Sequence, residues 1–184
     1  LVDVAFSGNG EPTSAPEFAE AVARVAQVLG RFGLAVPLRL ISNGSLLHRP
    51  AVQDGIRRLG EAGGEVWFKL DRATAAEVAA INGVAWAPEK AARNLETCAA
   101  LAPTWVQTCW FAFDGQAPDE ASLAAYCALL APLADQLAGV HLYGLARPSQ
   151  QPAAPRLAAL SEAALREVAA SIEKETGLRV IVSP

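Results

Sequence analysis

The amino-acid sequence predicts an α/β fold, in which helices cover a parallel β-sheet. Six apolar runs of strand length alternate with longer stretches of helical period. Several of these runs are apolar almost throughout, which is typical of strands buried on both faces of a parallel sheet. The chain has 184 residues, 52% of them apolar and 18% charged. This length and composition favour a sizeable core, so we expect a single domain over residues 1–184.

The first third of the chain contains two expected strands and two expected helices. The strand over 1–7 is the apolar run LVDVAFS, and a helix over 16–31 follows it with Ser14 as the expected cap. Apolar residues recur at helical spacing in this helix: Phe18, Val22, Val25, Val28 and Leu29. The run VPLRLIS forms a strand over 36–42, and a helix over 50–59 follows. Glycines after both helices mark their ends.

The remaining expected elements continue this alternation. Strands are expected over 65–71, 105–113, 139–145 and 178–183, and helices over 74–80, 89–101, 119–137 and 161–176. Asp119 and Ser161 begin two of these helices and are residues of the kind that cap helix N-termini. Because helical stretches separate the strands, the order favours parallel strands joined by helical crossovers.

The composition excludes some classes of partner. A net charge of -4 gives no electrostatic footprint for duplex nucleic acid. No apolar run reaches the roughly 18 residues of a membrane span, and the start shows no signal peptide. We therefore expect a cytoplasmic protein without a membrane partner. Its cysteines, Cys98, Cys109 and Cys127, are too widely spaced for a short metal motif, and we interpret them as buried apolar residues.

Polar residues follow the expected strands where each strand ends. They are Ser7 to Glu11, Ser42 to Ser45, Lys69 to Arg72, then Gln107, Thr108 and Asp114, and finally Tyr143 and Arg147. Ligands of parallel α/β folds bind beyond the carboxyl ends of the strands, so these residues predict a binding site. Lys69 lies within the apolar run VWFKL, where a lysine is costly unless it is paired or faces a cavity. We expect it to face a cavity, or to pair with Asp71 or Glu11.

The stretch SGNGEP, residues 7–12, follows the first expected strand. Gly8 and Gly10 allow the backbone to approach a ligand closely or to take a positive φ. Glu11 supplies a carboxylate that could accept from an ammonium group, and Pro12 stiffens the turn. Taken alone, this pattern equally suits an ordinary strand-to-helix turn.

Taken together, the strand ends resemble those of the radical S-adenosylmethionine (SAM) enzymes. SGNGEP is similar to the Gly-Gly-Glu-Pro element of that superfamily, and ISNG, residues 41–44, to its next strand end. FKLD, residues 68–71, is similar to the KLD strand of the branch containing glycyl-radical activases and tRNA-modifying iron–sulfur oxidoreductases. Later strand ends of that branch resemble VQT at 106–108, LY at 142–143 and Arg147-Pro148. The resemblance covers nearly the whole chain, in order.

The chain departs from that family in two ways. Asn9 separates the two glycines, so the element reads GNGEP. The family's C-x3-C-x2-C cluster motif is absent and would lie upstream of Leu1. The chain also contains no Met and begins inside an expected strand. We therefore expect an N-terminally truncated fragment that lacks the first βα unit and the ligands of the [4Fe–4S] cluster.

The resemblance implies a partial, open TIM-like barrel and a specific chemistry. The intact protein would be an oxidoreductase that binds S-adenosylmethionine and a [4Fe–4S] cluster, and generates a 5′-deoxyadenosyl radical for hydrogen abstraction. This chain alone would be inactive. The substrate would be a protein, a tRNA or a small molecule, and the electron donor a protein such as flavodoxin or ferredoxin.

The resemblance also implies which residues bind the cofactor. Those expected at its methionine end follow the first strand: Gly8, Gly10, Glu11 and Pro12. Those expected at its ribose or carboxylate follow the next two strands: Ser42, Asn43, Lys69 and Asp71. Those expected at its far side, or at the substrate, belong to later strands: Gln107, Tyr143 and Arg147.

Two other functions stay open at this point. Lys69, with Asp71 nearby, could form a Schiff base in an aldolase-type barrel enzyme, although this leaves residues 8–12 unexplained. Alternatively, the chain is a barrel without a cluster that binds a ligand or partner and has no catalytic activity.

Overall fold

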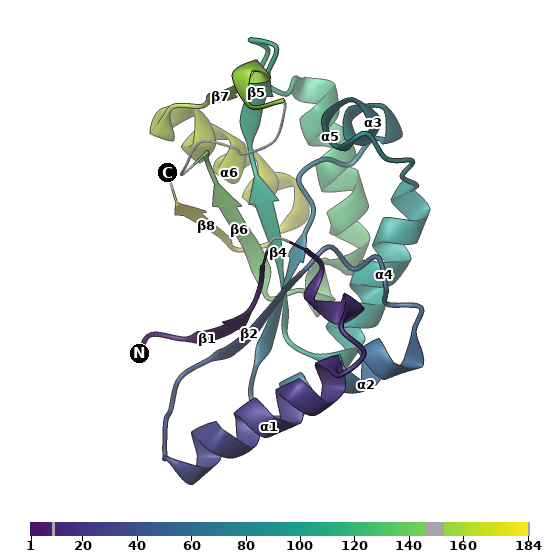
Figure 1. Ribbon diagram of the computed structural model, residues 1–184. Helices are drawn as coiled ribbons and strands as arrows, with labels where there is room; N and C mark the ends of the chain where they lie inside the picture. Colours follow the sequence, from purple (N-terminus) through teal and green to yellow (C-terminus); the bar gives the residue numbers. More distant parts are fainter. Residues whose placement is uncertain (9, 146–152, 184) are drawn as a thin grey trace. The chain divides into compact units, whose positions relative to one another are not determined.

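A computed structural model of the chain describes residues 1–8, 10–145 and 153–183. In these residues, six strands form one sheet in the order β1-β2-β3-β4-β6-β8. They are β1 (Val4–Phe6), β2 (Leu38–Ser42), β3 (Glu65–Lys69), β4 (Thr104–Cys109), β6 (Gly139–Tyr143) and β8 (Val180–Ser183). The pairs β1–β2, β2–β3 and β6–β8 are parallel. This open, mostly parallel sheet with alternating helices confirms the predicted α/β class and the partial TIM-like barrel (Figure 1).

The same residues contain six α-helices, three short 3-10 helices and a two-stranded ribbon. The α-helices are α1 (Phe18–Arg31), α2 (Pro50–Glu61), α3 (Ala75–Asn82), α4 (Pro88–Leu101), α5 (Glu120–Leu130) and α6 (Glu162–Thr176). The 3-10 helices are η1 (Pro12–Ser14), η2 (Ala131–Gln136) and η3 (Ala154–Arg156). In the ribbon, β5 (Phe111–Phe113) pairs with β7 (Leu157–Ala159) in antiparallel fashion. The chain divides into a first unit, Leu1–Lys69 with Arg93–Trp105, and a second unit, Leu70–Ala92 with Val106–Pro184.

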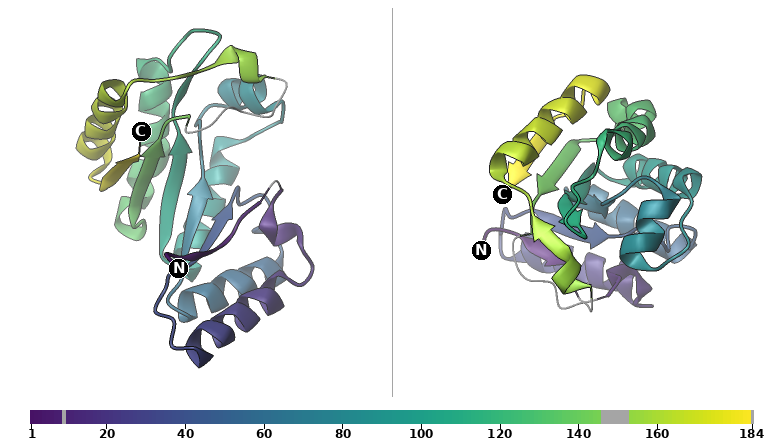
Figure 2. Two further views of the ribbon diagram at one scale, coloured as in Figure 1. Left: turned by 60° about the vertical axis from the view of Figure 1, so that its left-hand side comes forward. Right: turned by 90° about the horizontal axis from the view of Figure 1, so that it is seen from above.

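In the first unit, α1 and α2 cover one face of the strands β1 to β3 (Figure 2). Residues alternate along β2 and β3 between buried and half-buried positions, as expected when a helix layer covers one face. The two helices approach closely at Gly55, where an added Cβ would lie 2.5 Å from the Phe18 ring. Phe6 packs edge-on against the same ring, with centroids 6.0 Å apart. Phe18 thus joins α1, α2 and the end of β1.

The opposite face of β2 and β3 carries a network centred on Arg39. Its guanidinium pairs with Asp3 and with Glu65, whose Oε1 lies 2.7 Å from Nε. The Trp67 ring centroid lies 4.8 Å from the guanidinium carbon, and Trp67 Nε1 donates to the same Glu65 oxygen at 3.0 Å. Burial alone would lower the pKa of Arg39, but its bonds to Glu65 and Asp3 raise it overall. Arg39, the polar residue within the apolar strand β2, therefore has its charged partners in the first unit.

In the second unit, α5 and α6 bury apolar side chains beside β6 and β8. Tyr126 of α5, Leu165 and Ile172 of α6, and Leu142 of β6 are fully enclosed. The expected caps of both helices are confirmed. Asp119 accepts from Ser122 N at 2.8 Å, and Ser161 accepts from Ala164 N at 3.2 Å.

Two expected elements in the second half of the chain are interrupted. The strand expected over 105–113 ends at Cys109 and resumes as β5. Trp110 N still donates to Tyr143 O of the neighbouring strand β6 at 2.9 Å, and the chain then turns to pair with β7. The helix expected over 119–137 ends at Leu130 and continues as η2. Pro132 lies at the start of η2 and cannot donate the backbone hydrogen bond that a continued α-helix requires.

Two smaller features also differ from expectation. Ser14 belongs to η1 and does not cap α1, whose N-cap, Glu17, makes no side-chain cap bond. The strand β7 was not expected, since its residues Leu157–Ala159 carry no β-branched or aromatic side chain. Its pairing with β5 stabilises it instead.

Candidate functional site

In the first unit, the carboxylate of Glu11 joins the end of β1 to the end of β2. Its Oε1 accepts hydrogen bonds from Ser42 Oγ at 2.7 Å, Thr13 Oγ1 at 2.7 Å and Thr13 N at 3.2 Å. Its Oε2 accepts from Asn43 N at 2.8 Å. Hydrogen bonds to a charged acceptor are roughly twice as strong as neutral ones. Glu11 therefore fixes two loops to each other although they lie far apart in the sequence.

Local structure places Glu11 in this position. Glu11 is the N-cap of η1, and Pro12 is the first residue of that turn, where its missing N–H costs nothing. Thr13 follows and is 2% exposed, so both of its donors to Glu11 are enclosed. The sequence reasoning assigned the Glu11 carboxylate to an ammonium group of a ligand. In the structure, donors of the protein itself surround it.

The loop after β2 is closed by its own hydrogen bonds. Ser42 is 2% exposed, and its Oγ donates to Glu11 and accepts from Gly44 N at 3.0 Å. Asn43 is exposed, and its Oδ1 accepts from Ser45 N at 2.9 Å, which makes an Asx turn. Within the described residues, the side-chain nitrogen of Asn43 has no partner. The hydroxyl of Ser42 is therefore committed to the protein, whereas Asn43 presents an amide donor.

Gly44 is the most constrained residue of this loop. Its φ is +68°, and an added Cβ would lie 2.3 Å from Phe68 Cε2. The Phe68 ring is 2% exposed and enclosed in the core, so it has little room to move. The Gly44 carbonyl accepts from Asn94 Nδ2 of α4 at 3.0 Å. Glycine is therefore required here for both its backbone conformation and its lack of a side chain.

The glycines after β1 are in a different situation. Gly8 and Gly10 are both exposed, and an added Cβ on either would meet nothing within 4 Å. Neither belongs to the described glycines with positive φ. Asn9 between them lies outside the described residues. Packing within the chain does not require glycine at these two positions, and the space beside them leaves room for a ligand to approach the backbone.

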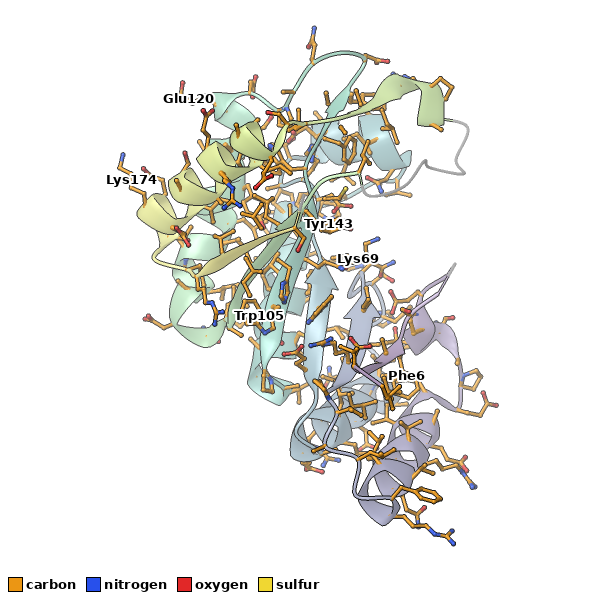
Figure 3. The ribbon with its side chains drawn as sticks, turned by 90° about the vertical axis from the view of Figure 1, so that its left-hand side faces the viewer. Phe6, Lys69, Trp105, Glu120, Tyr143 and Lys174 are labelled. Carbon is orange, nitrogen blue, oxygen red and sulfur yellow. The ribbon has the colours of Figure 1, made fainter. Side chains whose placement is uncertain are left out.

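Lys69 ends β3 and is exposed (Figure 3). It follows Glu65 and Trp67 on one face of the strand, since residues two apart point to the same side. The described part of the chain offers it no hydrogen bond or ion pair, so the expected pairing with Asp71 or Glu11 is not seen. An unpaired ammonium thus stands at the same edge of the sheet as Glu11 and Asn43, where the parallel strands β1 to β3 end.

In the second unit, the strand ends are built around Arg72, which is 4% exposed. Its guanidinium donates to the carbonyls of Asp71 at 2.7 Å, Cys109 at 3.3 Å and Phe111 at 2.9 Å. The Trp110 and Phe111 ring centroids lie 4.9 Å and 4.6 Å from its guanidinium carbon. Glu77 lies 3.5 Å from Nε. Burial lowers the pKa of Arg72, and the charges of Asp71 and Glu77 oppose that shift.

The other predicted residues of the second unit have mixed environments. Asp71 Oδ1 accepts from Cys109 N at 2.8 Å, which ties it to the end of β4. Gln107 is half-buried, and its carbonyl accepts from Leu70 N at 3.0 Å. Tyr143 ends β6 and is half-buried, and burial raises the pKa of its hydroxyl. Arg147 lies outside the described residues.

Sequence reasoning missed two residues that organise these strand ends, Thr13 and Asn94, and it placed Arg72 at a strand end without giving it a role. Thr13 directly follows a predicted site residue, Pro12, so a wider reading of that stretch could have included it. Asn94 lies in the middle of α4 and carries no comparable signal, because its partner is a backbone carbonyl 50 residues away.

No metal site is present in the part of the chain that the structure describes. No three His, Cys, Asp or Glu side chains there lie close enough together to hold an ion. Cys98, Cys109 and Cys127 form no disulfide within these residues, and all three are buried. Burial raises the pKa of Cys98 to about 12. None of the helices in the described residues is long and apolar enough to cross a membrane.

Comparisons with known proteins identify the fold. The chain is similar to a domain of pyruvate-formate lyase-activating enzyme from Bacteroides vulgatus ATCC 8482, with a TM-score of 0.65, 17% identity and coverage of 100% of both chains. It is also similar to a radical SAM methyltransferase from Sphaerobacter thermophilus, with a TM-score of 0.64, 16% identity and coverage of 100% of this chain and 51% of that one. No family model matches the chain, and no curated protein matches it.

At this level of identity the likeness concerns the fold. Both similar structures cover the whole of this chain, from the first strand to the last. The resemblance drawn from the strand ends is thus confirmed at the level of the fold. The chain has the fold of a domain found in a pyruvate-formate lyase-activating enzyme and in a radical SAM methyltransferase.

Proposed function

We propose that the chain is the core of a radical SAM enzyme and that the strand ends of its first unit bind S-adenosylmethionine. The observation that carries this proposal is the Glu11 carboxylate, which joins the exits of β1 and β2 by accepting from Ser42 and Asn43, and also accepts two hydrogen bonds from Thr13. This arrangement leaves polar groups exposed at one edge of the sheet, where parallel α/β folds bind ligands. The likeness in fold to a domain of pyruvate-formate lyase-activating enzyme and to a radical SAM methyltransferase supports the same function.

The groups at this edge fit the amino-acid end of S-adenosylmethionine. An ammonium group needs acceptors, and the exposed backbone at Gly8 and Gly10 provides carbonyls with open space beside them. A carboxylate needs donors, and Asn43 offers an amide N–H while Lys69 offers an ammonium. We therefore assign the methionine end of the cofactor to these four residues.

Glu11 acts on the ligand indirectly in this proposal. Four protein donors bind the carboxylate, three of them at Oε1 and one at Oε2. Its role is to hold the backbone after β1 and the Asn43 loop in the geometry that the ligand meets. Ser42 belongs to the same support, because its hydroxyl bonds to Glu11 and Gly44.

The iron–sulfur cluster would supply the electron that cleaves S-adenosylmethionine. The described residues do not provide a cysteine set for it, so its ligands would have to come from a segment beyond them. Asp71, Gln107, Tyr143 and Arg147 stay predictions for the rest of the cofactor or for the substrate. We propose an oxidoreductase in the intact protein, with an electron donor such as flavodoxin or ferredoxin. Its substrate would be a protein, a tRNA or a small molecule.

The aldolase alternative requires a lysine that is activated by an enclosed, apolar or cationic surrounding. Lys69 is exposed at the end of β3 and has no such surrounding in the first unit. Borohydride reduction in the presence of a carbonyl compound would trap Lys69 if the aldolase reading were right. We expect no trapped adduct.

The proposal is tested on the full-length protein purified without oxygen. We expect four irons and four sulfides per chain, and formation of 5′-deoxyadenosine from S-adenosylmethionine after reduction. Glu11→Ala should weaken S-adenosylmethionine binding by about tenfold or more, since two loops lose a charged anchor. The matched control is Glu17→Ala, because Glu17 is exposed and its side chain makes no cap bond. A colourless protein that does not cleave the cofactor, or a Glu11→Ala variant with unchanged affinity, would contradict the proposal.

A further inference from the structure

Asn94 supports the candidate site from a helix that sequence reasoning did not connect with it. It lies on α4 in the first unit and is half-buried. Its Nδ2 donates to the Gly44 carbonyl at 3.0 Å, across 50 residues of sequence. This carbonyl belongs to the loop that presents Asn43.

The loop from Ser42 to Ser45 has anchors of two kinds. Its N–H groups are bound from within or by Glu11: Asn43 N to Glu11, Gly44 N to Ser42 Oγ, and Ser45 N to Asn43 Oδ1. Asn94 holds the loop by a carbonyl, from the other side of the peptide chain. Glu11 and Asn94 therefore restrain this loop from two different elements, Glu11 at Ser42 and Asn43, and Asn94 at the Gly44 carbonyl.

The conformation at Gly44 explains why a second anchor matters. A glycine at φ +68° has access to many other conformations, so the residue by itself does not fix the turn. Phe68 blocks movement on one side, because its ring lies where a Cβ would stand. The hydrogen bond from Asn94 opposes rotation of the carbonyl. Together they restrict the Gly44 turn, across which the Asn43 side chain accepts from Ser45 N.

We infer that Asn94 is a positioning residue, which orients the Asn43 amide for the ligand by holding the Gly44 carbonyl. The inference rests on the proposed binding of S-adenosylmethionine at this edge. It concerns a residue that touches no ligand and acts through the loop alone. A residue with only a structural role in α4 would change the stability of the protein and leave the loop and the ligand affinity unaltered.

Two variants and one control separate these roles. Asn94→Ala removes the donor and places the best helix former on α4, so the helix itself is not weakened. Asn94→Asp keeps the shape of the side chain and replaces the donor by an oxygen that repels the carbonyl. The control is Thr97→Ala, whose hydroxyl donates only to Arg93 O of the same helix at 2.8 Å.

Two measurements are made on the anaerobic full-length protein and its variants. Hydrogen–deuterium exchange without ligand reports the amides of Asn43, Gly44 and Ser45. Titration with S-adenosylmethionine reports affinity. For both Asn94 variants we expect faster exchange at these amides and an affinity lower by about threefold to tenfold, the range for one net hydrogen bond. Thr97→Ala should match the wild-type protein in both measurements.

Each other outcome has a definite meaning. If an Asn94 variant keeps wild-type exchange or wild-type affinity, the inference is wrong while the proposed function stands. If Thr97→Ala causes the same losses, the effect belongs to α4 in general and the inference is also wrong. If wild-type protein with its cluster does not bind S-adenosylmethionine, the proposed function fails and this inference fails with it. Asn94→Asp, being isosteric, decides the matter if Asn94→Ala does not fold.

Discussion

In the first unit a carboxylate gathers the ends of the strands, and in the second unit a guanidinium does. Glu11 collects N–H and O–H donors from Thr13, Ser42 and Asn43. Arg72 collects backbone carbonyls, including those of Cys109 and Phe111. We call Glu11 and Arg72, each with its partners, the two hubs of the molecule. Both satisfy backbone groups where strands end, and they do so with opposite charges.

The two hubs differ in exposure. Arg72 is 4% exposed and lies between aromatic rings, whereas the loops that Glu11 holds end in exposed residues such as Gly10 and Asn43. A buried charge is costly unless all of its hydrogen bonds are made. Removal of the charge or of its partner is therefore strongly destabilising. The difference indicates that the Arg72 hub mainly stabilises the fold, while the Glu11 hub mainly shapes a surface that a ligand can reach.

The largest effect should come from Arg72→Met. This change fills the space between the rings but leaves the carbonyls of Asp71, Cys109 and Phe111 without their donor. We expect a loss of about 3 to 5 kcal/mol in the free energy of unfolding, the range for breaking a buried charged interaction. Urea denaturation measures it. Arg72→Lys should lose less, because it keeps the charge but not the planar fork. A loss below about 1 kcal/mol in Arg72→Met would remove the distinction between the two hubs.

The next effect should come from Gly44→Ala in the first unit. Alanine at φ +68° is strained by about 1 to 2 kcal/mol, and the clash with Phe68 adds a similar amount. We expect a total loss of about 3 kcal/mol in the free energy of unfolding. The matched control is Gly63→Ala, which has φ +75° and nothing within 4 Å of the added Cβ. It should lose only the strain, so equal losses in both variants would show that Phe68 does not constrain the loop.

A smaller effect should come from Tyr126→Phe. The Tyr126 hydroxyl lies 2.5 Å from Thr108 Oγ1, which itself lies 3.0 Å from the Leu70 carbonyl. Tyr126 is fully buried, and burial raises the pKa of its hydroxyl, so this contact is neutral at ordinary pH. We expect a loss of about 1 to 2 kcal/mol by thermal or urea unfolding. Thr108→Val combined with Tyr126→Phe should cost less than the sum of the two single changes. Simple additivity would contradict a direct bond between them.

The strand ends could be predicted from sequence because of a general geometric rule. Parallel strands end at the same edge of a sheet, so polar residues after consecutive apolar runs meet there. This rule brings Glu11, Ser42 and Asn43 together, and the structure shows them in contact. The polar residues within the strands were less predictable. Lys69, which interrupts an apolar run, is exposed as the last residue of β3.

Hydrogen bonds to backbone carbonyls could not be predicted in the same way. Every residue has a carbonyl, so the pairing of Asn94 with Gly44, or of Arg72 with Cys109 and Phe111, leaves no pattern in the sequence. The break after Cys109 has the same origin, since β5 pairs through its backbone with β7, whose residues carry no β-branched or aromatic side chain. The interruption after Leu130 is different. Proline at 132 is a visible signal for it.

The smallest effect should come from Asp114→Asn, and it tests whether burial is what makes Arg72 important. Arg156 also lies over an aromatic ring, 4.1 Å from the Phe113 centroid, and pairs with both oxygens of Asp114 at 2.8 Å and 2.5 Å. Both side chains of this pair are about half exposed, so water and salt screen their charges. We expect a far smaller loss of stability than in Arg72→Met, although the geometry of the pair is bidentate.

The pH dependence identifies this contribution. The bond to Arg156 lowers the pKa of Asp114 from its ordinary value of 3.8, with burial opposing and the charge of Arg156 adding to the shift. A lowered pKa in the folded state means that the stabilisation is present above 3.8 and is lost as the pH falls through the lower folded value. The temperatures of thermal unfolding of the wild-type protein and of Asp114→Asn should therefore differ at neutral pH and converge in strong acid. Added salt should narrow the neutral difference, because the pair is exposed. A difference that persists in acid or in high salt would mean that Asp114 acts through its backbone turn, where its φ is +52°, and not through its charge.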